Sequence, residues 1–188
     1  WVGYHQQVDS KLMRNNGDGT FTRVARNVTA RVNEDGGVLD RHDCAWADVD
    51  LNGWPDMYCS GGRNLENYVK TAEKDNELWL QVSRGRFEEA GTEWGVGDPC
   101  GRGRFVAFLD LDNDGWDDLF VGNEKPRDVD DPGCDDATDP SWHEYSKVFL
   151  NDHGERFVFA PQFATPHPSA AVNCAVPLDY NKDGWTDL

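Results

Sequence analysis

Basic residues are scarce in this chain. Its 188 residues include 18 Lys and Arg against 35 Asp and Glu, which gives a formal net charge of −17. Nucleic-acid phosphates and anionic membrane surfaces repel such a protein, so we expect neither as a partner. An excess of carboxylates is typical either of a solvated acidic surface or of cation binding. Their placement along the chain has to decide between the two.

Long apolar runs are also missing. No stretch approaches the roughly 18 apolar residues of a membrane-spanning helix, so we expect no direct membrane insertion. No segment has helical periodicity, and no signal peptide is visible. The sequence begins at Trp1 rather than at Met, which favours a mature or excised piece, so the missing signal does not argue against secretion.

Recognisable catalytic motifs are absent as well. None of the five histidines has a zinc-ligand spacing, and the sequence contains no nucleophile elbow or phosphate-binding loop. The histidines are His5, His42, His143, His153 and His167. Carboxylate pairs that would suit glycoside hydrolysis are the ones that a cation would bind. We therefore expect a binding protein rather than an enzyme.

What the sequence does contain is an internal repeat. Three acidic segments align without gaps, at 48–56 (DVDLNGWPD), 110–118 (DLDNDGWDD) and 179–187 (DYNKDGWTD), with starts 62 and 69 residues apart. Short, nearly continuous apolar runs flank the segments, as expected of strands buried on both faces; 104–109 and 119–121 are examples.

A second motif recurs out of phase with the acidic segments, at 11–21, 77–87 and 147–157. Apolar-rich residues, a turn of Gly, Asn or Asp, and then a Phe in each copy predict a β-hairpin. Four antiparallel strands in every repeat form the pattern of a β-propeller blade.

The sequence therefore predicts an all-β chain, 1–188, with about three β-propeller units at 1–57, 58–119 and 120–188. Both ends cut the repeat at the same phase. Propellers usually close with roughly four to eight blades, and three blades alone would leave exposed edge strands. We expect further blades of a longer chain, or other subunits, at the open edges.

Oxygen-bearing side chains occupy positions 1, 3, 5 and 9 of all three acidic segments, with Gly at position 6 and Trp at position 7. Turn preferences explain one or two such residues but not the whole set. Ca²⁺ takes about six to eight oxygen ligands, and the backbone carbonyl at position 7 can supply one. We expect about three Ca²⁺ ions, one in each segment. The predicted ligands are Asp48, Asp50, Asn52, Trp54, Asp56, Asp110, Asp112, Asp114, Trp116, Asp118, Asp179, Asn181, Asp183, Trp185 and Asp187.

Two other kinds of cation site, an EF-hand and a Mg²⁺ site, fit the acidic segments less well. An EF-hand would need Glu at position 12 and flanking helices, whereas position 12 is Cys59 in the first segment and Val121 in the second. Mg²⁺ tolerates a crowded, irregular protein cage poorly. The middle segment has aspartate at four ligand positions against three in each of the others, which predicts that it binds Ca²⁺ most tightly.

At these residues the chain resembles the FG-GAP/VCBS repeat family, the integrin α-subunit-like β-propellers. The segment 15–21 (NNGDGTF), together with 44–48 (CAWAD), is similar to its secreted, cartilage acidic protein-like branch. The resemblance implies Ca²⁺ in the loop between the first and second strands of each blade, at the segments given above. One departure is Pro177, which lies within an inner strand and cannot donate to its ladder, so we expect irregular structure there.

The five cysteines and a single glycosylation sequon at Asn27 favour an oxidising compartment. Cys44 lies four residues before the first acidic segment and Cys59 three after it, so the two should be cross-strand neighbours. We expect a disulfide between them. The alternative is two small buried apolar residues, because the next repeat has Val106 and Val121 at these positions.

The other three cysteines have less defined surroundings. Cys100 and Cys134 fall in predicted loops and could pair with each other. Cys174 would then be either a buried thiol or the partner of a cysteine outside this chain. No C-x-x-C spacing is present, which argues against a cysteine metal site.

Strand alternation places the acidic loops and the Gly-turn hairpins at one end of the blades. The long, irregular connections lie at the other end, where rigid scaffolds often carry specificity. They are 26–40, 62–75, 90–103, 124–145 and 160–172. We expect an extracellular calcium-binding adhesion module that binds a protein or glycan ligand there. Two alternatives stay open: the non-catalytic or lyase propeller part of a carbohydrate-active enzyme, and a structural subunit of a surface filament or sheath.

Overall fold

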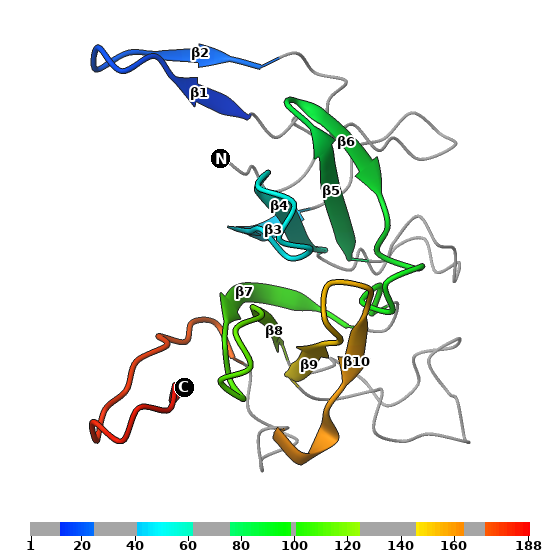
Figure 1. Ribbon diagram of the computed structural model, residues 1–188, viewed down its shortest axis with the longest axis vertical. Coiled ribbons are helices and arrows are strands. Elements are labelled where there is room, and N and C mark those ends of the chain that lie inside the picture. Colours follow the sequence, from blue (N-terminus) through cyan, green and yellow to red (C-terminus); the bar gives the residue numbers. More distant parts are fainter. Residues whose placement is uncertain (1–11, 25–40, 62–75, 99–100, 125–145, 164–171) are drawn as a thin grey trace.

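The computed structural model describes residues 12–24, 41–61, 76–98, 101–124, 146–163 and 172–188 (Figure 1). These residues form β-strands and one short 3₁₀ helix, and none of their helices is long and apolar enough to cross a membrane. The elements are β1 (Met13–Asn15), β2 (Phe21–Arg23), β3 (Arg41–Ala47), β4 (Asp56–Gly61), β5 (Glu77–Ser83), β6 (Arg86–Glu89), β7 (Gly103–Leu109), β8 (Asp118–Asn123), β9 (Lys147–Asn151), β10 (Phe157–Phe159) and η3 (Pro161–Phe163).

Two four-stranded antiparallel sheets dominate the fold. In each sheet the strands pair in chain order, as β3-β4-β5-β6 and as β7-β8-β9-β10, and a separate hairpin pairs β1 with β2. The predicted all-β class is confirmed, and four antiparallel strands in a repeat are confirmed for two of the three repeats. The sheets span 41–89 and 103–159. No closed ring of sheets is formed by the part of the chain that the structure describes.

The third acidic segment lies in a less regular region. Residues 172–177 form no strand, and Leu178 pairs with Asp187 through an isolated antiparallel bridge. The equivalent residues of the second sheet, Leu109 and Asp118, pair in the same way. The irregular backbone agrees with the expectation for Pro177, which has no N–H to donate.

Strands buried on both faces follow from the apolar runs. In β4 every residue from Asp56 to Ser60 is buried, and alternate side chains point to opposite faces. Tyr58 joins the cluster between the two sheets, whereas Met57 and Cys59 join a second cluster on the far face.

The two sheets pack through unlike faces. Their shared core contains Tyr58 and Leu78 from the first sheet and Leu119, Val121 and Phe149 from the second. In the repeat, Phe120 is the equivalent of Tyr58, yet it faces away from this core. One face of the first sheet therefore meets the opposite face of the second. Such head-to-tail packing can be repeated to close a ring.

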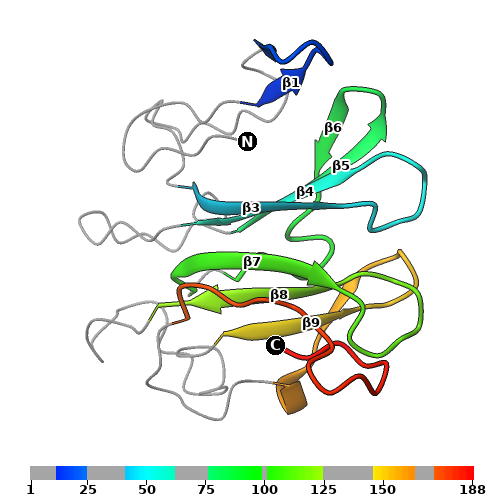
Figure 2. The same ribbon diagram turned by 90° about the vertical axis from the view of Figure 1, so that its left-hand side faces the viewer.

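We call the contact between the two four-stranded sheets the junction. The first strands of the two sheets, β3 and β7, lie next to each other there (Figure 1). The Val106 amide donates to the Asp43 carboxylate across it, with N···Oδ2 at 3.1 Å. The β3–β4 and β7–β8 connections emerge at the same end of the sheets, together with the β9–β10 turn and the 179–187 loop (Figure 2). The expected placement of acidic loops and hairpin turns at one end is confirmed for these connections.

One predicted disulfide is present. Cys44 and Cys59 lie directly opposite each other on β3 and β4 and are joined through their Sγ atoms. Cys100, Cys134 and the Asn27 sequon lie outside the described residues. Cys174 is exposed and unbonded in the described part of the chain, so the alternative of a buried thiol there is wrong.

Candidate metal centre

The acidic segments 48–56 and 110–118 connect the first two strands of each sheet, and 179–187 spans the Leu178–Asp187 bridge. All three adopt one backbone conformation. Position 4 is left-handed, with φ of +52°, +58° and +63°, and the glycine at position 6 has φ of +89°, +91° and +90°. Only glycine adopts the latter values without strain, which explains its presence in every copy.

Side-chain hydrogen bonds hold each loop closed in the same way. The position 1 carboxylate accepts from the amide of the position 6 glycine at 2.9, 3.0 and 2.9 Å. The position 9 carboxylate accepts from the position 2 amide at 2.9, 2.9 and 3.1 Å. Positions 1 and 9 are thereby brought together at the centre of the loop.

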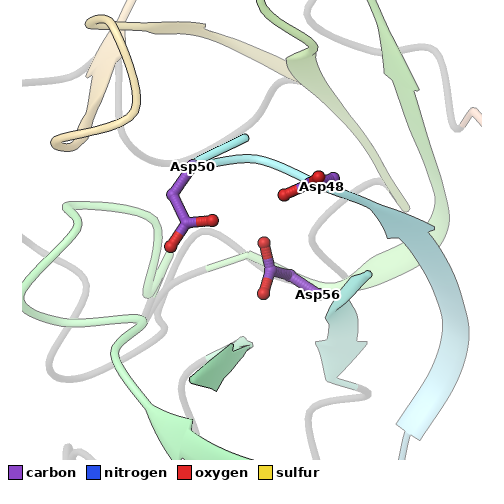
Figure 3. Close-up of side chains that lie close together, drawn as sticks. All are labelled: Asp48, Asp50 and Asp56. Atoms are coloured by element: carbon purple, nitrogen blue, oxygen red, sulfur yellow. The ribbon is translucent and has the colours of Figure 1, made fainter. Parts of the chain in front are cut away.

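In the first loop, three carboxylates converge. Asp48, Asp50 and Asp56 each offer an oxygen within 4.8 Å of the others, and Figure 3 shows all three side chains directed toward a common point. The Oδ1 atom of Asp48 is buried and has no hydrogen-bond partner. A buried carboxylate oxygen without a donor is unfavourable unless a cation compensates it.

The second loop repeats the arrangement with Asp110, Asp112 and Asp118, whose oxygens also lie within 4.8 Å of one another. Asp114 lies outside this group, and its Oδ1 accepts from the Trp116 amide at 2.9 Å. In the third loop, the acidic side chains form no such group within the described residues.

The position 9 aspartates have perturbed acidities. Burial raises the pKa of Asp56 to about 6, although the Gln81 and Val49 amides act to lower it, and the charges of Asp50 and Asp48 raise it further. Asp56 is fully buried. Cation binding would replace the proton that burial favours, since a carboxylate must be deprotonated to bind a metal.

Asp118 has the same environment in the second loop. Burial raises its pKa to about 6, against the Asn151 and Leu111 amides, and the charges of Asp112 and Asp114 add to the rise. Its neighbour Asp117, at position 8, also has a raised pKa, first through burial and then through the charges of Asp110 and Asp48. Asp117 therefore lies in the electrostatic field of both loops. Sequence reasoning passed over it because position 8 is Pro55 and Thr186 in the other two copies.

Sequence reasoning also missed the residues that support position 9. Gln81 lies on β5, the third strand of the first sheet, and its backbone amide donates to Asp56 Oδ1 at 2.7 Å. Asn151 takes this place in the second sheet and donates to Asp118 Oδ1 at 2.8 Å. The signal was available in the hairpin motif, whose fifth residue is Asn15, Gln81 or Asn151 in the three copies.

The side chains of Gln81 and Asn151 each bond the acidic loop of their own sheet and the turn of the adjacent hairpin, and we call this pair of contacts the clamp. The Gln81 amide group donates to the Pro55 carbonyl at 2.9 Å, and its Oε1 accepts from the Gly85 amide at 2.7 Å. Gln81 thus ties the first acidic loop to the turn of the β5–β6 hairpin. In the first hairpin, Asn15 Oδ1 accepts from the Gly17 amide, two residues further along the chain, at 2.9 Å.

The donor set fits a hard divalent cation. Three carboxylates at a loop, one of them with an unpartnered buried oxygen, supply the oxygen ligands that Ca²⁺ prefers. Position 7 is Trp54, Trp116 or Trp185, and a backbone carbonyl there would be a further oxygen ligand of the kind that Ca²⁺ takes. Most of the connections predicted to bind a macromolecular ligand at the other end lie outside the described residues, namely 26–40, 62–75, 99–100, 125–145 and 164–171.

A scan of the chain against models of protein families finds no match, and a search of curated proteins finds no similar sequence.

Proposed function

We propose that the chain is a calcium-binding β-propeller module in which Ca²⁺ stiffens the connections between the first and second strands of each blade. The observation that carries the proposal is the convergence of three carboxylates in each of two loops of identical design. Without a cation, these charges would repel one another across less than 5 Å. A bound Ca²⁺ turns that repulsion into attraction.

Membership of the FG-GAP/VCBS family and a propeller architecture belong to this proposal. Head-to-tail packing of two four-stranded sheets supports it, because each sheet offers one face to the preceding unit and the other to the next. The sheet faces around Met57 and Phe120 would be the contacts with neighbouring blades or subunits.

The module would bind rather than catalyse. Calcium fixes one end of each sheet, and the unequal connections at the other end would present a surface to a protein or glycan ligand. An extracellular location is supported by the Cys44–Cys59 disulfide, since disulfides persist mainly in oxidising compartments.

Thermal unfolding tests the proposal. The melting temperature of the chain is measured with millimolar Ca²⁺, with millimolar Mg²⁺ and with chelator. A ligand present at about 100 times its dissociation constant stabilises a protein by about 2.7 kcal/mol for each site. We expect a marked rise in Tm with Ca²⁺ and a small one with Mg²⁺. Equal melting temperatures in Ca²⁺ and in chelator would contradict the proposal.

A further inference from the structure

Asn151 contacts both metal loops. Its side-chain amide donates to the Val49 carbonyl at 2.9 Å and to the Asp117 carbonyl at 3.2 Å. Val49 stands between Asp48 and Asp50 of the first loop, whereas Asp117 precedes Asp118 of the second. The contact with Val49 joins residues 102 positions apart.

The Asn151 clamp differs from its counterpart in the first sheet. The side-chain nitrogen of Gln81 donates to Pro55 of its own sheet. Asn151 makes the equivalent bond to Asp117 and adds the bond to Val49 across the junction. It is 4% exposed, so both bonds are shielded from water.

The β9–β10 turn strengthens this connection. A Cβ at Gly154 would lie 2.5 Å from the Trp116 ring and 3.1 Å from the Asp50 Cα, so the turn fits between the two loops. The Gly154 amide in turn donates to Asn151 Oδ1 at 2.8 Å. The turn, Asn151 and both loops therefore form one contiguous contact network.

We propose that Asn151 couples the two metal loops, so that cation binding at the first strengthens binding at the second. An ion at the first loop fixes the backbone around Val49, which holds the Asn151 side chain. The backbone amide of Asn151 then holds Asp118 in place before the second ion arrives. Less ordering remains for the second ion to impose, which is positive cooperativity.

This inference rests on the proposed cation binding, but it makes a separate claim. Coupling between two sites is reciprocal, so losing the first site must weaken the second by the same factor as the reverse. We expect a coupling factor of at least about 5, at the lower end of typical allosteric couplings.

Calorimetric titration of the whole chain with Ca²⁺ measures the factor. All proteins carry Asp183→Ala, so that the third loop does not contribute. Asp50→Ala isolates the second loop and Asp112→Ala isolates the first. The coupling factor is a ratio of association constants. It is the product of the two stepwise constants with both loops intact, divided by the product of the constants of the two isolated loops.

The near-isosteric Asn151→Leu should reduce the factor to about 1. The matched control is Gln81→Met, which removes the same clamp bonds in the first sheet and none across the junction. It should weaken the first loop and leave the factor unchanged. A merely structural role for Asn151 would lower both affinities without changing the factor.

A second measurement needs no change at Asn151. In the Asp112→Ala protein, Ca²⁺ at the first loop should slow hydrogen exchange of the Leu111 and Asn151 amides at least about 5-fold, because both donate to Asp118. Unchanged exchange, or a coupling factor that survives Asn151→Leu, would overturn the inference. Two ions that bind with a factor of 1 would overturn it and leave the proposed function intact, whereas no binding at either loop would overturn both.

Discussion

Gly103, at the start of β7, lies against Ser60 of β4 so closely that a Cβ on Gly103 would sit 2.4 Å from the Ser60 Cβ. The next junction has the reverse arrangement. There, Gly122 takes the place of Ser60, and Val172 takes the place of Gly103 at 3.1 Å from the Gly122 Cβ position. One of the two positions is glycine at each junction, which lets successive units approach closely.

Gly103→Ala should therefore destabilise the chain by about 1–3 kcal/mol, as overpacking of a tight contact does. Adding Ser60→Gly should restore most of the loss, because the double variant resembles the Gly122–Val172 junction. Urea unfolding of both variants gives the free energies of unfolding. Additive effects of the two changes would show that this contact is not the cause.

The Cys44–Cys59 disulfide should contribute to stability. It closes a chain segment of 15 residues, for which the chain-entropy model gives about 3 kcal/mol. We expect the Cys44→Ala, Cys59→Ala double variant to lose about that much free energy of unfolding. The exposed Cys174 offers the control, since Cys174→Ser should leave stability unchanged.

Lys147 and Asp98 form an ion pair with side chains only 1% and 0% exposed, and Asn123 donates to the same carboxylate at 2.9 Å. Lys147→Met should cost about 3–5 kcal/mol, because it leaves a buried carboxylate without its cation. Replacing Asp98 by Asn as well should recover much of the loss. In the exposed Arg86–Glu88 pair, Arg86→Ala should change stability by less than about 1 kcal/mol.

The pH dependence of cation binding follows from Asp56 and Asp118. Both have a pKa raised from 3.8 to about 6 by burial, so each must lose a proton to bind a cation below that pH. Calcium affinity at each loop should be constant above about pH 7 and fall up to about 10-fold for each pH unit below 6. Calorimetry between pH 5 and 7.5 checks this. An affinity independent of pH would contradict the assigned role of position 9.

The stability of the chain in chelator should change with pH in the opposite sense. A carboxyl whose folded pKa is raised binds its proton more tightly when folded, so its stabilisation is complete below about pH 4 and is lost as pH rises through about 6. Asp56→Asn should weaken this dependence. Stability in chelator that rises between pH 4 and 6, with no effect of Asp56→Asn, would contradict the raised pKa.

The loops were predictable because their signal is local. Nine consecutive residues specify the turn, the glycine and the carboxylates that converge in the first two loops, and the symmetric placement of Cys44 and Cys59 about one loop was enough to predict their pairing. The contacts of Asn151 and Gly103 were not predictable in this way. Their partners, Val49 and Ser60, lie in the preceding sheet, and only the packing of one sheet on the next brings them together.

The central claim is that the acidic loops bind calcium, and the stoichiometry of binding tests it most directly. Calorimetric titration of the chain in excess Mg²⁺ should detect at least two Ca²⁺ ions. Asp50→Ala and Asp112→Ala should each remove one of them, and the double variant should remove both. Binding of no Ca²⁺, or a stoichiometry that neither substitution changes, would contradict the account.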